Sequence, residues 1–310
     1  MRANGIDIHL EEAGSGPLVL LLHGFPELSF SWRHQLPALA AAGHHAVAVD
    51  LRGYGRSTAP VDVTAYAMRE MVADAVAVLD GLGEPAAALV GHDWGAQIAW
   101  AAAALHPDRF PAIAALSVPF QPRTPVPPTE QLREWAGDRL NWLLYFQRPG
   151  VADAEFAADP ERAMRLIMYG LSGDAGELGT RLVTELPGGA RLLDSIPEPA
   201  ALPAWLELEP YVREFSRTGF TGALNRYRNV DRDWHDLPAV GATTIGQPAL
   251  FIGGEFDTAT RYADWTAIRE RVPRLADPLI LAGCGHWVQQ ERPVEVNDHL
   301  IWFLRENAFA

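Results

Sequence analysis

Gly91-His92-Asp93-Trp94-Gly95 stands between two apolar segments of this 310-residue chain. The segment before it, residues 84–90, suits a buried strand, and the alanine-rich segment after it, residues 95–106, suits a helix. Gly91 and Gly95 allow a turn whose backbone comes close to its neighbours. Strand, tight turn and helix form the context of the G-x-S-x-G nucleophile elbow, so we expect Asp93 at the place of the serine.

A carboxylate at this place changes the chemistry that the elbow can perform. Aspartate is ionised at neutral pH, because its ordinary pKa is about 3.9, and it needs no base to act as a nucleophile. Attack on a saturated carbon leaves an alkyl ester, which water can cleave, whereas a serine would leave an ether. Asp93 is therefore a candidate nucleophile; the alternative is that it only caps the helix.

Two further residues complete the order nucleophile, acid, histidine that α/β hydrolases present. Asp257 and His286 each follow an apolar run that is typical of a buried strand. Both are therefore expected just beyond the carboxyl ends of strands, where open α/β sheets build their sites. Glu255 is a rival for the acid, and Asp257 is favoured because it lies further into the loop.

With these residues in place, the chain resembles the soluble epoxide hydrolases of the α/β-hydrolase superfamily. The matching motifs are Gly14-Ser15-Gly16-Pro17, His23-Gly24-Phe25-Pro26-Glu27, Ser31-Trp32-Arg33, Asp50 to Ser57, Gly91 to Gly95, Tyr145 to Gly150, Tyr227-Arg228-Asn229 and Cys284-Gly285-His286-Trp287. They span nearly the whole chain, although some are shared with haloalkane and haloacetate dehalogenases. The resemblance implies that Asp93 is the nucleophile, Asp257 the acid and His286 the base.

The resemblance also implies an oxyanion hole beside the nucleophile. The backbone N–H of Trp94, the next residue, and that of Phe25 are the expected donors. His23 is expected among the substrate-binding residues of the site, where it orders the loop of Phe25; the alternative is a histidine at a strand end. The bond between Phe25 and Pro26 is a candidate for a cis peptide.

One position departs from the family pattern, which has two cap tyrosines that donate hydrogen bonds to the epoxide oxygen. Tyr227 matches the second tyrosine, but Trp142 stands at the place of the first. An indole N–H donates a hydrogen bond and cannot deliver a proton. Tyr145 lies one helical turn from Trp142, so it either shares the substrate-binding face or packs in the core of the cap.

The order of strand-like and helix-like segments along the chain predicts an α/β-hydrolase fold, with a mostly parallel central sheet, flanking helices and an inserted all-helical cap. The expected strands are residues 6–13, 18–22, 46–50 and 112–116, and the expected helices are residues 32–42, 68–82, 130–146, 160–171 and 210–227. Five prolines between residues 119 and 128 interrupt this order and suggest a stiff connector. We therefore expect core at residues 1–120, cap at 121–240 and core again at 241–310.

Composition narrows the classes of partner. A hydrophobic content of 48% suits a globular enzyme, and a net charge of −14 argues against nucleic acid and anionic membranes as partners. The single cysteine, Cys284, permits a reducing compartment. With no signal peptide in residues 1–16 and no apolar run near the ~20 residues of a membrane span, we expect a cytoplasmic protein. No metal or organic cofactor is implied, and the sequence leaves the oligomeric state open.

The expected function is hydrolysis of a small-molecule epoxide to a vicinal diol through an ester on Asp93. The alternative is a haloalkane or haloacid dehalogenase that uses the same three residues, with Trp94 and Trp142 as halide ligands. Tyr227 favours the epoxide. A third possibility is a non-catalytic ligand-binding protein on a hydrolase scaffold, which an intact nucleophile, acid and base argue against.

Overall fold

The computed structural model of this chain describes residues 1–179 and 188–307, and it is built around one seven-stranded sheet. The strands are β3 (Leu10–Ala13), β4 (Leu18–Leu22), β5 (His45–Val49), β6 (Ala88–His92), β7 (Ala112–Leu116), β8 (Ala249–Gly254) and β9 (Leu279–Leu281). Their order is β3-β5-β4-β6-β7-β8-β9, with β3 antiparallel to β5 and the other neighbours parallel. The predicted α/β-hydrolase sheet, mostly parallel, is thereby confirmed.

The first expected strand, residues 6–13, is divided in the structure. Residues Asn4 and Gly5 adopt positive φ angles and turn the chain, so that β1 (Arg2–Ala3) pairs with β2 (Ile6–Asp7) in a separate two-stranded sheet. Only the later part, β3, joins the main sheet. The pattern of residues 6–13 shows no break in the sequence. The strand is divided because β2 pairs with β1, whereas β3 pairs with β5.

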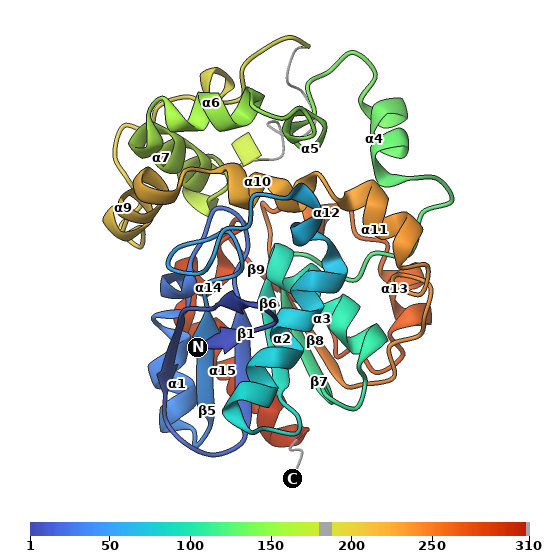
Figure 1. The fold of residues 1–310 in the computed structure, drawn as a ribbon. Coiled ribbons are helices and arrows are strands. Elements are labelled where there is room, and N and C mark those ends of the chain that lie inside the picture. The colour runs from blue at the N-terminus through green and yellow to red at the C-terminus, as the bar shows by residue number, and fades with distance from the viewer. Residues whose placement is uncertain (180–187, 308–310) are drawn as a thin grey trace.

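The central strands are buried on both faces. In β4, Leu20 and Leu22 belong to one hydrophobic core, whereas Val19 and Leu21 belong to a second core on the opposite face. The helices that flank the sheet are α1 (Gln35–Ala41), α2 (Met68–Leu82), α3 (Trp94–Leu105), α12 (Thr258–Arg261), α13 (Trp265–Arg271), α14 (Val288–Glu291) and α15 (Pro293–Glu306). Figure 1 shows α2 and α3 on one side of the sheet and α1 and α15 on the other. A strand covered on both faces explains an unbroken apolar run.

Between β7 and β8 the chain leaves the sheet. This part contains α4 (Pro128–Ala136), α5 (Trp142–Phe146), α6 (Val151–Ala157), α7 (Pro160–Gly170), α9 (Glu209–Thr218), α10 (Thr221–Tyr227) and α11 (Val230–Asp236). In the described residues 128–179 and 188–236 it forms helices and no strand, and Figure 1 shows it lying across one end of the sheet. Residues 180–187 of the predicted cap lie outside the described residues.

Three predicted helices are interrupted. The helix expected at 130–146 is split into α4 and α5, because Gly137 leaves the helix with a φ of 56° and Asn141 caps a new one through a bond from Leu144 N–H. The helix expected at 210–227 is split into α9 and α10 at Gly219, whose φ is 70°. Residues 32–42 form the 3-10 turn η1 (Ser29–Trp32) and then α1.

Three short 3-10 turns complete the described elements: η2 (Val63–Tyr66), η3 (Gly173–Ala175) and η4 (Leu193–Ser195). Within residues 1–179 and 188–307, no helix combines the length and the apolar character needed to cross a bilayer.

The register of the sheet gathers several strand ends at one edge. Leu22 at the end of β4 lies beside Gly91 of β6, and Leu116 at the end of β7 lies beside His92 and Ile252. The loops that follow β4, β6 and β8 therefore emerge next to one another, beneath the helical segment.

Candidate active site

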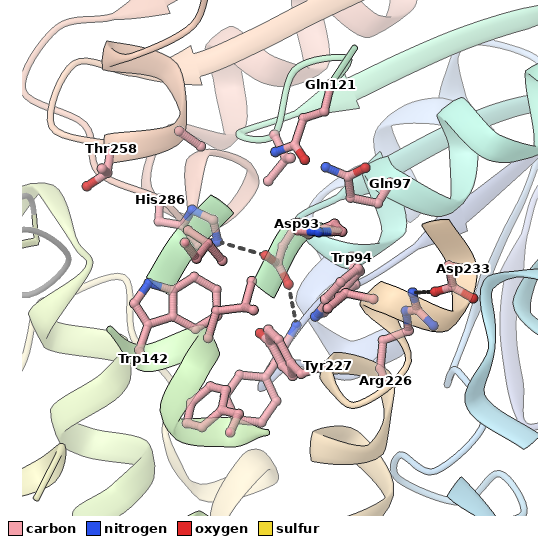
Figure 2. Close-up of a pocket in the computed structure, with 18 of the residues that line it drawn as sticks. Asp93, Trp94, Gln97, Gln121, Trp142, Arg226, Tyr227, Asp233, Thr258 and His286 are labelled. Carbon is pink, nitrogen blue, oxygen red and sulfur yellow. Dashed lines mark hydrogen bonds and ion pairs between the residues drawn. The ribbon is translucent and has the colours of Figure 1, made fainter. Parts of the chain in front are cut away.

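Asp93 occupies the turn between β6 and α3 and has a φ of 52° and a ψ of −115°, a conformation that few non-glycine residues adopt. Only small residues permit this turn, because a Cβ atom on Gly95 would lie 1.9 Å from the carbonyl oxygen of Leu22. The turn projects the Asp93 carboxylate into a cavity, as Figure 2 shows. This geometry is that of a nucleophile elbow.

His286 lies between two carboxylates. Its Nδ1 donates to Asp257 Oδ2 at 2.8 Å, and its Nε2 lies 3.7 Å from Asp93 Oδ2. Asp257 is buried, and its Oδ1 accepts from the backbone N–H of Ala259 at 3.0 Å, so that both of its oxygens are held. Glu255 is exposed and accepts from the backbone N–H of Gly283 instead. The structure therefore brings Asp257, and not Glu255, to the histidine.

The two carboxylates set the protonation of His286. Burial by itself would lower the pKa of His286, but Asp257 and Asp93 outweigh burial and raise that pKa well above its ordinary value of 6.5. The ring is therefore an imidazolium at neutral pH while Asp93 carries its charge. Removal of the charge on Asp93 removes one of the interactions that raise this pKa.

The other oxygen of Asp93 has a backbone partner. The N–H of Phe25 donates to Asp93 Oδ1 at 2.8 Å, and the Phe25–Pro26 peptide is cis. The backbones come this close because residue 24 is glycine: a Cβ there would lie 2.3 Å from Asp93 Oδ1. Trp94 begins α3, so its N–H has no acceptor within its own helix. The two expected oxyanion donors therefore flank Asp93.

His23 lies beneath this loop and not in the cavity wall. Its Nδ1 donates to the carbonyl of Gly24 at 2.8 Å, and its Nε2 accepts from the N–H of Leu51 at 3.0 Å. The ring is fully buried, and burial lowers its pKa, which keeps it neutral. His23 is not among the residues that line the cavity, so this geometry gives no support to a contact with substrate, and both bonds are consistent with the ordering of the Phe25 loop.

A buried ion pair, absent from the sequence-based candidates, supports the same loop. His92 Nδ1 donates to Glu27 Oε2 at 2.5 Å, and Glu27 Oε2 also accepts from the backbone N–H of Gly24 at 3.1 Å. Glu27 Oε1 accepts from the side chains of Gln289 and Gln290 at 2.8 and 2.9 Å. Burial would raise the pKa of Glu27, but His92 lowers it to about 2. The sequence did hold a signal for this pair, because Glu27 and His92 are titratable residues that stand inside two of the motifs quoted above.

Tyr227 stands across the cavity from the elbow, within a group of aromatic rings. Its ring centroid lies 4.9 Å from that of Trp94, 5.0 Å from Phe146 and 5.4 Å from Phe25 and Trp142. Burial, and then the charge of Asp93, raise the pKa of Tyr227 well above 10.0, so its hydroxyl keeps its proton at neutral pH.

Trp142 and Tyr145 face different surroundings. Trp142 lines the cavity, and Figure 2 shows its ring nitrogen on the side away from Asp93 and Tyr227. Tyr145 is buried and donates its hydroxyl to Glu155 Oε2 at 2.5 Å, inside the helical segment. Of the two positions expected for Tyr145, this geometry is that of the second, because its polar end is bound in the core of that segment.

The cavity lies between the sheet edge and the helical segment and has a volume of about 520 Å³. Asp93, His286, Asp257 and Tyr227 all line it, and most of the remaining wall is apolar. This size and lining are typical of a site for a small organic molecule.

Comparison with known proteins agrees with this geometry. The family model described as "alpha/beta hydrolase fold" matches residues 17–293. Epoxide hydrolase A of Mycobacterium tuberculosis is 46% identical over 306 residues, which cover 97% of this chain and 95% of that protein. The crystal structure of epoxide hydrolase A from Mycobacterium thermoresistibile has a TM-score of 0.93 and 48% identity, over 98% of this chain and 97% of that one. The structure of potato epoxide hydrolase I has a TM-score of 0.89 and 37% identity, and the match covers 99% of this chain and 98% of that chain.

Fold and cavity together are those of a hydrolase of the α/β class. The chain belongs to the α/β-hydrolase fold family and, within it, to the epoxide hydrolases. The expected enzyme class is thereby confirmed, and the dehalogenase alternative is not favoured.

Proposed function

We propose that this enzyme opens an epoxide to a vicinal diol in two steps, through an alkyl ester on Asp93. The observation that carries the proposal is the difference between the two oxygens of Asp93. Oδ1 is held by the Phe25 N–H at 2.8 Å, whereas Oδ2 has no donor as close and faces the cavity beside His286. Oδ2 is therefore the attacking atom, and Oδ1 becomes the carbonyl oxygen of the ester.

In the first step Oδ2 attacks an epoxide carbon, and the C–O bond on the opposite side breaks. The departing oxygen becomes an alkoxide, which is a stronger base than a phenolate, so it takes the proton of Tyr227 despite the high pKa of that hydroxyl. Tyr227 is suited to this step because it keeps its proton until such a base forms. The indole N–H of Trp142 faces the other way and supplies no second proton.

Ester formation removes the negative charge of Asp93, and this prepares the second step. The pKa of His286 falls because one of its two carboxylate partners is now neutral. The proton that His286 releases is available to restore Tyr227. Neutral His286, with its Nδ1–H held by Asp257, then takes a proton from water, which attacks the ester carbon.

The attack of water places negative charge on Oδ1. Phe25 N–H already lies at hydrogen-bond distance from this atom, and the N–H of Trp94 begins the adjacent helix. Such preorganised donors are typically worth about 3–4 kcal/mol each in the barrier. Collapse of the tetrahedral intermediate breaks the ester C–O bond, and the proton of the added hydroxyl passes to the departing oxygen, which releases the diol and returns Asp93 as a carboxylate.

A dehalogenase activity finds less support in the same cavity. A halide would need N–H donors from Trp94 and Trp142. The indole nitrogen of Trp94 is buried, and that of Trp142 points away from Asp93. Tyr227, whose hydroxyl keeps its proton, lines the same cavity as Asp93 and can supply a donor to an epoxide oxygen.

We further propose that residues 121–240 act as a cap that closes the cavity over the sheet edge, and that the enzyme works in the cytoplasm. The cap proposal is supported by the number of cavity residues that α5, α7, α10 and α11 contribute. The proposed cytoplasmic location is supported by the single cysteine, which is compatible with a reducing compartment.

An assay with three substrates tests the proposed reaction. The enzyme is incubated with an aryl epoxide, a bromoalkane and a haloacetate, and diol and halide are measured. We expect diol from the epoxide, and a His286→Gln variant should accumulate a protein adduct whose mass is that of enzyme plus epoxide, located on Asp93. Halide without diol, or an adduct on another residue, would refute the proposal.

A further inference from the structure

The loop after β9, which carries the candidate base, lies against the end of α7 so closely that both segments need glycine. A Cβ atom on Gly285 would lie 2.4 Å from the carbonyl oxygen of Leu171, and one on Gly173 would lie 2.3 Å from a carbonyl oxygen of the loop. Any side chain at either position would push the two backbones apart. We call residues 171–173 and 283–287 together the seam.

Hydrogen bonds cross the seam at the base itself. The backbone N–H of His286 donates to the carbonyl of Leu171, the residue that ends α7, at 2.8 Å. The indole N–H of Trp287 donates to the carbonyl of Met168, within α7, at 2.7 Å. The helical segment therefore holds the main chain of His286, in addition to the bond that Asp257 makes with its ring.

Glu291, the last residue of α14, has its carboxylate in the middle of the seam. Its Oε2 accepts from the backbone N–H of Gly173 at 2.8 Å and from that of Gly285 at 3.0 Å, and its Oε1 accepts from the backbone N–H of Trp287 at 3.0 Å. One side chain thus binds the residues on both sides of His286 and one residue of the helical segment. Glu291 is buried and is not among the residues that line the cavity, so the proposed reaction leaves it without a role.

The surroundings of Glu291 offer donors to both of its oxygens. Burial raises the pKa of Glu291, which the three N–H groups and Arg292 counteract only in part. The thiol of Cys284 is bonded to the same carboxylate, and burial, followed by Glu291, raises the pKa of this thiol, so it keeps its proton. A glutamine here has a single acceptor oxygen, and its NH₂ group would face a buried N–H that it cannot satisfy.

We propose that Glu291 is a positioning residue for the second step, which acts by fixing the backbone of His286 against the helical segment. This inference rests on the proposed two-step reaction. In the first step ionised Asp93 attacks without a base, so a small displacement of the His286 ring has little effect. In the second step the ring must reach a water molecule that is also aligned with the ester carbon. A misplacement of about 1 Å can cost about 100-fold in rate in such a step.

Glu291→Gln tests the proposal through the two rates of a single turnover. With excess enzyme and an aryl epoxide, rapid quenching and mass analysis follow the formation and the loss of the ester on Asp93. We expect formation near the parental rate and hydrolysis slower by about 10-fold to 100-fold. Glu155→Gln is the matched control, because Glu155 is also buried and accepts a backbone N–H, that of Leu193, but lies inside the helical segment. It should lower stability and leave the ratio of the two rates unchanged.

A second variant opens the seam from the side of the helical segment and keeps Glu291. In Gly173→Ala the added Cβ must displace the loop of His286, so hydrolysis of the ester should again slow selectively, by about 10-fold. Gly246→Ala is its control, because a Cβ at Gly246 meets no atom within 4 Å, and both rates should stay parental. This pair keeps the test decisive if Glu291→Gln does not fold.

Amide hydrogen exchange measures the seam without any turnover. In Glu291→Gln the N–H groups of Gly285 and Trp287 lose a strong acceptor, so a peptide that covers residues 283–288 should exchange faster than in the parent, whereas Glu155→Gln should leave it unchanged. Parental exchange in Glu291→Gln, or formation and hydrolysis of the ester slowed equally or not at all in Glu291→Gln and Gly173→Ala, would overturn the positioning role alone. No ester on Asp93 in the parent would overturn the proposed reaction and this role with it.

Discussion

His92 donates a hydrogen bond from Nε2 to the backbone carbonyl of His286, 2.8 Å away. The same carbonyl accepts from the hydroxyl of Ser117 at 2.5 Å. Since His92 Nδ1 also lies 2.5 Å from Glu27 Oε2, both of its ring nitrogens face acceptors. The residue before the candidate nucleophile thus fixes the backbone of the candidate base, and a buried charge pair connects both to the Phe25 loop.

Glu27→Gln should destabilise the protein, because it removes a buried carboxylate that faces four donors: His92, the backbone N–H of Gly24, and the side chains of Gln289 and Gln290. We expect the free energy of unfolding at neutral pH to fall by about 3 kcal/mol, measured by urea denaturation. Glu207→Gln is the control: Glu207 is 60% exposed and pairs with Arg33, so its loss should cost less than about 1 kcal/mol. Equal losses in the two variants would contradict this interpretation.

The same pair predicts a pH dependence of stability. The pKa of Glu27 falls from 4.5 to about 2 on folding, so its contribution is complete above pH 4.5 and is lost as the pH decreases through about 2. In Glu27→Gln this contribution is missing, so unfolding free energy should depend less steeply on pH between 4.5 and 2. Parallel pH profiles for parent and variant over that window would show that Glu27 is not ionised in the folded state.

Asp257→Asn should slow hydrolysis of the ester and move its pH dependence. Asp257 raises the pKa of His286, and the second step needs neutral His286, so the acid limb of the rate should shift to lower pH when this carboxylate is lost. The plateau rate should fall about 100-fold or more, because the histidine also loses the group that orients its ring. Single-turnover measurements with quenching and mass analysis of the ester give both quantities. Glu255→Gln, which alters an exposed carboxylate near the same loop, should keep the parental profile.

The sequence alone predicts the elbow, the order of the three candidate catalytic residues and the sheet, because each depends on local pattern. Asp93, Asp257 and His286 each follow the carboxyl end of an apolar strand, and parallel strands bring such ends to one edge of the sheet. Packing between distant segments is not visible in such patterns. Tyr145 shares helical spacing with Trp142, yet in α5 it is Phe146, one position further, that lines the cavity with Trp142. The position of Glu155, ten residues away, decided where Tyr145 points.

Tyr227→Phe should slow formation of the ester while leaving its hydrolysis nearly unchanged. The variant keeps the ring that packs against Trp94 and Phe146 but has no proton to give the alkoxide, so the alkylation rate should fall about 100-fold to 10,000-fold. Rapid-quench measurement of the adduct separates the two steps. Tyr145→Phe is the matched control, because its hydroxyl is bound to Glu155 outside the cavity wall and its loss should affect stability alone. A slower second step in Tyr227→Phe would assign this hydroxyl a different role.

Trp142→Tyr should accelerate formation of the ester. Trp142 lines the cavity 5.4 Å from Tyr227, measured between ring centroids, but its N–H is turned away from Asp93, so the alkoxide receives no bond from this position. A tyrosine would place a hydroxyl there, and one additional hydrogen bond of about 0.5–1.5 kcal/mol corresponds to a gain of about 2-fold to 10-fold in the alkylation rate. Trp142→Phe controls for the lost volume, since it enlarges the cavity similarly without adding a donor. If the two variants form the ester at the same rate, the gain comes from space and not from the hydroxyl, and a single donor at Tyr227 is sufficient for this enzyme.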